Sequence, residues 1–272
     1  MLNRSTHLIL IPPNAYYDTA HNPLRVLCKD GFYVIKANHS NSLFDDFGFA
    51  NEFICSCLLN LWGLNTPEIA VVRADPDLIS KANLPKDYIP KLYSKPCFGS
   101  KFIESPNEFL PEFFNNTQIK FRNKISNYRE LIFVGLFDLW VKNEDRAPVH
   151  PNLITGYSQK NQKIFAIDHY KTLNFNHPTN DFAVNNLLLE SNSILNTPLL
   201  RSIFNEAKND IPLIETTFLR NIESCKASFS KMMDGIEDLT HFNCTHRSIL
   251  AENLFNFKRN KTIFAHFLKI VR

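Results

Sequence analysis

Residues 137–154 read FDLWVKNEDRAPVHPNLI and join the end of an apolar run to a polar loop that contains two prolines. The run itself, residues 128–142, is apolar on one broad face, which is typical of a helix buried between other helices. The loop offers a carboxylate at Asp145 and an amide at Asn152. Asn, Asp and Pro are also ordinary loop residues, so the alternative is a solvated loop that caps the helix.

Two short β-like runs follow, NLIT at 152–155 and KIFAID at 163–168, separated by a turn-prone segment. Asp168 ends the second run, and a carboxylate at the end of a buried strand is a natural magnesium ligand. A turn aspartate is the alternative. Phosphoryl transfer needs one carboxylate for the acceptor hydroxyl and oxygen ligands for magnesium. The order of loop Asp, loop Asn, short hairpin and strand-end Asp therefore favours a functional set over a coincidence.

The chain before this region is rich in β-like runs. Residues 22–37 predict a hairpin, because two β-prone runs flank an Asp-Gly turn. Residues 50–63 predict a helix that ends at Gly63. Residues 68–72 and 98–104 predict strands, and the Pro-, Lys- and Asp-rich stretch between them, residues 73–97, predicts an exposed connection.

Helical periodicity extends from about residue 180 to the end, most clearly in 196–233 and 246–270. A β-rich first part and a helical second part predict an α+β architecture with two lobes. The pattern breaks at Ser105-Pro106-Asn107. We therefore expect a first lobe over residues 1–104 and a helical lobe over residues 105–272.

Lys36 and Glu52 form a second candidate pair. Lys36 ends an apolar strand, so a buried Lys36 would need an acidic partner. The alternative is a lysine at the strand edge that faces water. Glu52 falls in the first turn of the expected helix, where a carboxylate also suits the helix dipole. Together they fit the ion pair between a strand lysine and a helix glutamate that positions the lysine on nucleotide phosphates in kinases.

Composition narrows the possible functions. Of the 272 residues, 44% are hydrophobic, which is enough for a sizeable core. The charged fraction of 21% is close to the average of globular proteins and argues against disorder. The net charge of +3, without a long Lys/Arg run, is weak evidence for an anionic ligand and none for nucleic-acid binding. The six cysteines lack zinc spacing, which predicts buried, reduced thiols. No run approaches the length of a membrane span, so we expect a cytoplasmic protein.

This ensemble resembles the HipA-like kinases, especially the compact HipA-like kinase domain group, and more distantly the phosphatidylinositol kinases. The resemblance covers roughly residue 17 to the C-terminus. It rests on YVIKA, ANEFICSCLLNLWGLNTPE, FGSKF, FDLWVKNEDR with HPNLI, and FAIDH. It implies a two-lobed protein-kinase-like fold, a small β-rich lobe beside a larger helical lobe, with ATP in the cleft between them.

The resemblance also implies roles for single residues. Lys36 would contact the ATP phosphates, and Glu52 would orient it. Asp145 would be the catalytic aspartate. Asn152 and Asp168 would hold Mg²⁺.

The adenine and phosphate contacts follow from the same resemblance. FGSKF would lie at the hinge, with Lys101 and Phe102 as the contacts to adenine. Residues 16–26, expected to cover the phosphates, contain no glycine. A glycine-rich loop exposes backbone amides to phosphate. This loop must instead use backbone amides or the side chains of Thr19, His21 and Asn22.

Other residues near these motifs have more than one interpretation. We interpret Arg146 as a partner in a structural ion pair with Glu144 or Glu130; the alternative is a contact with phosphate. His150 and His169 either assist magnesium or substrate, or face water. The loop from Asp145 to Asn152 is longer than the Asp-Arg-His-x-x-Asn loop of the phosphatidylinositol kinases, which favours the HipA-like comparison.

Three functions remain open from the sequence. The first is a protein Ser/Thr kinase that uses ATP and Mg²⁺, with a small antitoxin-like partner and with Ser40 or Ser42 as sites of autophosphorylation. The second is a catalytically weak nucleotide-binding module that acts through a protein partner. The third is a small-molecule kinase, in which Asn143 stands where an HxDxxxxN loop has its histidine.

Overall fold

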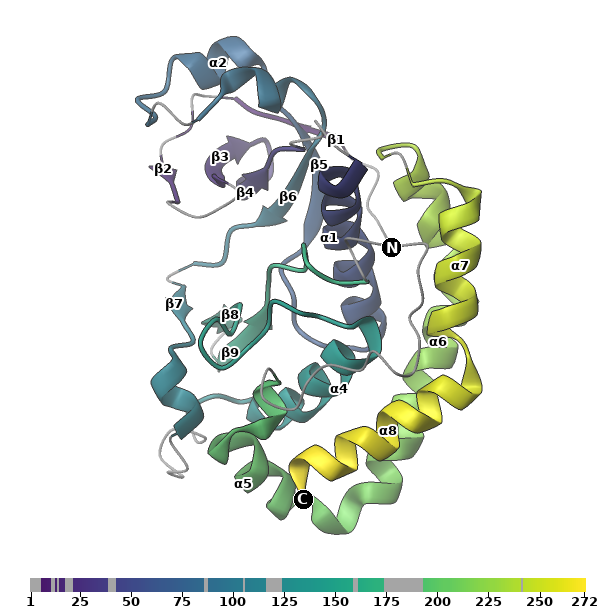
Figure 1. The fold of residues 1–272 in the computed structure, drawn as a ribbon. Coiled ribbons are helices and arrows are strands. Elements are labelled where there is room, and N and C mark those ends of the chain that lie inside the picture. The colour runs from purple at the N-terminus through teal and green to yellow at the C-terminus, as the bar shows by residue number, and fades with distance from the viewer. Residues whose placement is uncertain are drawn as a thin grey trace.

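The computed structural model combines two β-sheets with a set of helices (Figure 1). It describes residues 6–10, 13, 15–17, 22–38, 43–85, 88–104, 106–115, 124–158, 161–173, 193–240 and 242–272. Thr19, His21, Ser40 and Ser42 lie outside the described residues. None of the helices described is long and apolar enough to cross a membrane.

The first part of the chain forms a six-stranded sheet in the order β1-β5-β6-β4-β3-β2. The strands are β1 (Thr6–Leu8), β2 (Ala15–Tyr16), β3 (Leu24–Cys28), β4 (Gly31–Lys36), β5 (Ile69–Arg73) and β6 (Cys97–Lys101). β1 runs parallel to β5, and the other neighbours are antiparallel. The predicted hairpin and the two predicted strands are confirmed.

Alternation along the strands gives this sheet two different faces. Ile69, Val71 and Phe98 point to the face that packs on helix α1 (Leu43–Leu61) and join the large core. The neighbouring strand residues Ala70, Val72 and Cys97 point to the opposite face. This face is covered by α2 (Pro76–Ser80) and the 3₁₀ helix η1 (Pro90–Ser94). Residues 73–97 are therefore not wholly exposed as expected, because Ile79 and Tyr93 anchor them in a core.

Helix α1 begins at Leu43 rather than at residue 50. Glu52 consequently lies in the middle of the helix, and its predicted place in the first turn is wrong. The expected boundary failed because Phe47 and Phe49 extend the buried face and Gly48 lies inside the helix. A Cβ at Gly48 would fall 2.2 Å from the ring of Tyr170, so tertiary packing explains this glycine.

The second sheet has the order β7-β8-β9, with β7 (Asn107–Glu108), β8 (Leu153–Ser158) and β9 (Asn161–Ala166), all antiparallel. The hairpin predicted after Asn152 is confirmed. The 3₁₀ helix η2 (Pro111–Asn115) follows β7, and η3 (Tyr128–Glu130) leads into helix α4 (Leu131–Val141). All residues of α4 except Phe133 are buried, as predicted for the apolar run.

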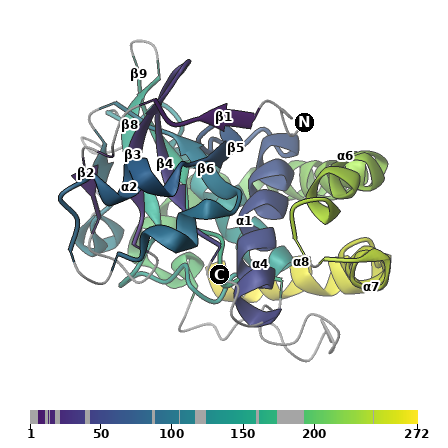
Figure 2. The ribbon, with the colours of Figure 1, turned by 90° about the horizontal axis from the view of Figure 1, so that it is seen from above.

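The remaining helices pack around α1 and α4 (Figures 1 and 2). They are η6 (Ile194–Asn196), α5 (Pro198–Glu206), η7 (Lys208–Asp210), α6 (Ile211–Glu237), α7 (Cys244–Leu254) and α8 (Phe257–Val271). Seen from above, α1 separates the six-stranded sheet from α6 and α7 (Figure 2). The β-rich first part and helical second part confirm the predicted α+β architecture. All six cysteines are free and five are buried, whereas Cys244 is exposed, contrary to expectation.

Candidate active site

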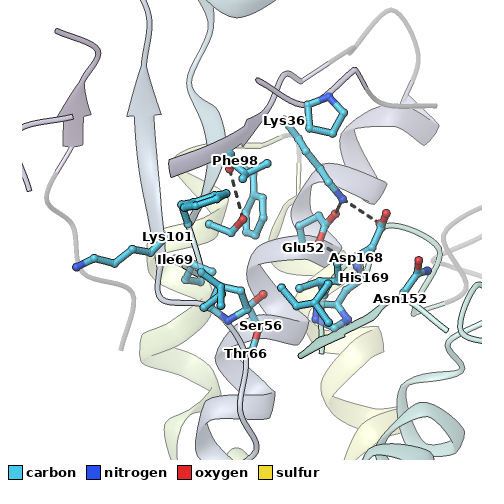
Figure 3. A pocket seen from close by; sticks show the side chains of 18 of the residues that line it. Lys36, Glu52, Ser56, Thr66, Ile69, Phe98, Lys101, Asn152, Asp168 and His169 are labelled. Carbon is cyan, nitrogen blue, oxygen red and sulfur yellow. Dashed lines mark hydrogen bonds and ion pairs between the residues drawn. The ribbon is translucent and has the colours of Figure 1, made fainter. Parts of the chain in front are cut away.

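A cleft of about 420 Å³ lies between the six-stranded sheet and the β8–β9 hairpin (Figure 3). Its walls come from β4, α1, β5, β6, the segment after β6, and the loops that precede β8 and follow β9. Six of the predicted site residues line it: Lys36, Glu52, Lys101, Phe102, Asn152 and Asp168. Residues that are far apart in sequence therefore meet at one cavity.

Lys36 reaches the cleft because of strand alternation. Tyr33 and Ile35 face the α2 side of the sheet, so Lys36 faces α1. Its Nζ lies 2.5 Å from Oε1 of Glu52 and 3.0 Å from Oδ1 of Asp168 (Figure 3). The side chain is 15% exposed, so the predicted ion pair is present and the alternative of a strand-edge lysine in water is wrong.

The charges of this group depend on one another. Burial disfavours the charge on Lys36, but the carboxylates of Asp168 and Glu52 outweigh it and raise the pKa of the lysine. Burial also raises the pKa of Glu52, while Lys36 and the main-chain amide of His169 act in the opposite direction. That amide donates to Oε2 of Glu52 at 2.9 Å. Lys36 is thus a buried cation held in one place by two acids.

The loop after α4 is shaped by Asn143. The main-chain amide of Asn143 donates to the carbonyl of Asp138 at 2.9 Å, which ends the helix after a left-handed residue at Lys142. The side-chain oxygen of Asn143 accepts from the amides of Asp145 and Arg146, and its nitrogen donates to Asp138. Asn143 is buried, so it supports the loop instead of facing a substrate.

Asp145 and Asn152 meet despite the seven-residue step between them. Ala147 and His150 exchange two backbone hydrogen bonds, of 3.1 and 3.0 Å, so the extra residues form a tight turn. Nδ2 of Asn152 then lies 3.4 Å from Oδ2 of Asp145. Asn152 has a φ of 47°, a left-handed conformation that Asn tolerates better than most residues.

Arg146 joins the two functional loops, a role that the sequence did not reveal. Its Nη1 donates to the carbonyls of Pro151, Asn152 and Ile167, and its Nη2 donates to Nδ1 of His169 at 3.2 Å. These acceptors belong to the loop before β8 and the segment after β9. One buried guanidinium therefore fixes the position of the two loops relative to each other.

The ion-pair partner of Arg146 is Asp138, at 3.1 Å, and the predicted pairing with Glu144 or Glu130 is wrong. Glu144 instead pairs with Lys142 at the surface. Burial raises the pKa of Asp138 to about 6, although the charge of Arg146 opposes this shift. A lone carboxylate inside the apolar stretch FVGLFDLWV was the signal for this pair.

His169 is 1% exposed, so the expectation that it faces water is wrong. Burial, reinforced by the charge of Arg146, lowers the pKa of His169 well below its usual value. The imidazole is therefore neutral, and because arginine only donates, Nδ1 accepts and Nε2 carries the proton. His150, by contrast, is exposed at the turn of the loop.

Lys101 and Phe102, the residues expected to contact adenine, line the cleft as predicted, but their side chains contact other residues of the protein. Lys101 lines the cleft, but its ammonium pairs with Glu68 at 3.2 Å and points away from the cavity (Figure 3). The guanidinium of Arg25 lies 5.2 Å from the ring centroid of Phe102. The main-chain amide and carbonyl of the next residue, Ile103, have no hydrogen-bond partner among the described residues. Ile103 also lines the cleft, so its unpaired main-chain groups are candidates for a polar contact with a ligand there.

The turn between β2 and β3 lines the cleft, but through residues other than the predicted Asn22. Asn22 has a φ of 43° and its carbonyl accepts from the hydroxyl of Tyr93, and it does not line the cleft. Tyr17 and Pro23, from the same turn, do line it. A left-handed residue in this turn is the conformation that glycine provides in a glycine-rich loop.

Asn152 and Asp168 form a donor set that fits a magnesium ion. The side-chain oxygen of Asn152 accepts no hydrogen bond from any described residue, and both residues line the cleft. Across the described part of the chain, no three His, Cys, Asp or Glu side chains gather as a metal site. One carboxylate and one amide suit Mg²⁺, which usually takes its other ligands from water and phosphate oxygens.

This geometry, with Lys36 held by Glu52 and Asp168 and with Asp145 and Asn152 nearby, is the arrangement expected of a kinase-like phosphotransferase. A family model of HipA-like kinases matches residues 18–211, and the chain belongs to this family. No curated protein matches the sequence. Among solved structures, the proinflammatory kinase CtkA of Helicobacter pylori superposes with a TM-score of 0.54 at 12% identity, covering 96% of each chain. This likeness shows the shared fold, and the expected distant similarity to phosphatidylinositol kinases is not shown by these matches.

Proposed function

We propose that this chain transfers the γ-phosphoryl group of ATP to a Ser or Thr hydroxyl of a protein, with Mg²⁺ as the metal. One observation carries the proposal. A single cleft holds Lys36 on Glu52 and Asp168, with Asn152 beside both the cleft and Asp145. Phosphoryl transfer depends mainly on positioning and on charge stabilisation, and these residues supply both.

Each residue has a distinct task in this proposal. Lys36 binds phosphate oxygens, and Glu52 keeps its ammonium in place. Asn152 and Asp168 bind Mg²⁺, which neutralises phosphate charge. Asp145 accepts the hydrogen bond of the acceptor hydroxyl and orients its oxygen toward the γ-phosphorus. The side chain of Asp145 is 29% exposed, so an acceptor can reach it from solvent.

The apolar part of the cleft suits a purine base. Its walls include Val34, Ile69 and Phe98, and Ile103 also lines the cleft. Flat apolar walls with a few placed polar groups are typical of nucleotide pockets. This arrangement supports adenine binding through the main chain of the hinge.

The test compares the wild type with Asp168→Ala, by thermal shift with ATP and Mg²⁺ and by release of ADP. We expect ATP with Mg²⁺ to raise the melting temperature of the wild type and to be converted slowly to ADP, because binding to the folded state stabilises it. Both effects should be lost in Asp168→Ala. Absence of any stabilisation of the wild type at millimolar ATP and Mg²⁺ would contradict the proposal.

A second candidate function is a nucleotide-binding module with little or no turnover. The observation in its favour is the β2–β3 turn, where residues 17–23 lack glycine and Asn22 takes the left-handed conformation. Stabilisation of the wild type by ATP without ADP release, even with protein acceptors such as casein, would favour this module over the kinase.

A further inference from the structure

Lys171 lies three residues after Asp168, outside the set of predicted site residues. Its Nζ is 3.1 Å from Oδ1 of Asp145, the oxygen that Asn152 does not contact. The lysine side chain is 47% exposed, so its ammonium stands at the solvent side of the aspartate. The ammonium therefore lies beside the carboxylate that an acceptor hydroxyl would contact.

The backbone around Lys171 is held firmly. Its carbonyl accepts from the amide of Glu144 at 3.0 Å, and the amide of Leu173 donates to the carbonyl of Val141 at 2.8 Å. The side chain of Asn51 donates to the carbonyls of the two residues that flank Lys171. The root of the side chain is thus fixed against α1 and the catalytic loop, while the ammonium remains free to shift within reach of Asp145.

The other cations described in these loops are committed elsewhere. Lys36 is bound to Glu52 and Asp168, Arg146 is buried on Asp138 and three carbonyls, and Lys142 pairs with Glu144. Lys171 is the remaining cation next to Asp145 in the described part of the two loops. Its pairing is with the same carboxylate that the proposed function assigns to the acceptor.

We propose that Lys171 is a further catalytic residue, whose ammonium binds an oxygen of the phosphoryl group while that group moves to the acceptor. The inference rests on the proposed function. In this step a bond forms between the acceptor oxygen and the γ-phosphorus. The bond to the β–γ bridging oxygen breaks, its electron pair leaves with ADP, and the hydroxyl proton passes to Asp145.

The chemistry of lysine suits this task. During transfer, negative charge spreads over the three equatorial oxygens of the phosphoryl group. An ammonium has three donors on a flexible stem, so it can keep one hydrogen bond to Asp145 and give another to a phosphoryl oxygen. In a turn without glycine, fewer backbone amides are free to approach the phosphates. Lys171, from the segment after β9, would add a donor next to Asp145.

The test uses Lys171→Met and Lys171→Arg in the full chain, with Lys261→Met as control. Lys261 also forms an exposed pair, with Glu215 at 2.7 Å, but on the C-terminal helices away from the cleft. Calorimetry measures the affinity for ADP with Mg²⁺, with and without aluminium fluoride, which mimics the phosphoryl group in transfer. ADP release from ATP gives turnover.

We expect the wild type to bind ADP at least tenfold more tightly when aluminium fluoride is present. In Lys171→Met this gain should disappear and turnover should fall about a hundredfold, within the range for loss of a group that stabilises transition-state charge. Affinity for ADP alone should not change. Lys171→Arg should recover part of the gain, and Lys261→Met should match the wild type.

The contrary results separate the two proposals. If the wild type binds ADP and Lys171→Met keeps the full gain with aluminium fluoride, the role of Lys171 is wrong and the proposed function stands. Faster turnover in Lys171→Met would mean that the pair blocks Asp145, which also overturns the inference. If the wild type binds no ADP with Mg²⁺, the proposed function fails and the role of Lys171 fails with it.

Discussion

Arg146 shows how much one buried side chain organises in this molecule. It pairs with Asp138 on α4 and donates to main-chain carbonyls on both sides of the β8–β9 hairpin. The loop of Asp145 and Asn152 and the segment of Asp168 therefore share one cation. A residue with these contacts positions the functional groups without touching a substrate.

Arg146→Met should destabilise the fold by about 3–5 kcal/mol, because it leaves the carboxylate of Asp138 buried and unpaired. Urea unfolding followed by circular dichroism measures the change. Arg247→Met is the matched control, since Arg247 pairs with Asp234 at an exposed site. Exposed pairs contribute about 0–1 kcal/mol. Equal losses in the two variants would show that the Arg146 contacts do not hold the loops.

At the level of elements, α1 supports the segment that carries Asp168. Gly48, Asn51, Glu52 and Cys55 follow the spacing of one helix face, and all four contact residues 168–172. The ring of Tyr170 lies where a side chain at Gly48 would be. The helix thus does more than supply Glu52, because a whole face of it supports the segment that carries Asp168.

Gly48→Ala should lower stability by about 1–3 kcal/mol, because the added methyl group overlaps the Tyr170 ring and the two must separate. The affinity for ADP with Mg²⁺ should fall with it, since the displaced segment contains Asp168. Gly235→Ala in α6 is the control: a Cβ there meets nothing within 4 Å, so helix propensity should stabilise the protein by up to about 1 kcal/mol. If Gly48→Ala stabilised the protein, the close packing of the Tyr170 ring on Gly48 would be refuted.

For the whole molecule, the helices beyond the matched family region complete the core under the active site. The family match ends at residue 211, where α6 begins. α6 packs on α1, and α8 packs on α4, where a side-chain nitrogen of Arg259 donates to the carbonyl of Trp140. Both α1, which carries Glu52, and α4, which leads into the loop of Asp145, therefore rest on the C-terminal helices.

Phe267→Ala should cost about 3–5 kcal/mol, because this fully buried ring of α8 packs on Phe204 and Phe264. Phe257→Ala, at the start of the same helix, removes a ring that is 68% exposed and should change stability by less than about 0.5 kcal/mol. Thermal denaturation compares the two variants with the wild type. Similar melting temperatures for both would mean that α8 is not part of the core.

Much of the fold and part of the site could be predicted from local signals. The Asp-Gly turn indicated the hairpin that carries Lys36, and the apolar run before Asp145 indicated a buried helix. These patterns are local, since turn chemistry and side-chain periodicity depend on neighbours within a few residues. The association of Lys36 with Glu52 followed from their order along the chain in a known kind of site, and the ion pair is present.

The sequence by itself thus determined the main strands and helices that carry the candidate residues, and their order along the chain. Only the tertiary structure decided the start of α1, the partner of Arg146, the burial of His169 and the approach of Lys171 to Asp145. Each of these depends on contacts between separate elements, some more than a hundred residues apart, such as Asn51 with Thr172. Periodicity and turn signals carry no information about such contacts, because they arise only when the core packs.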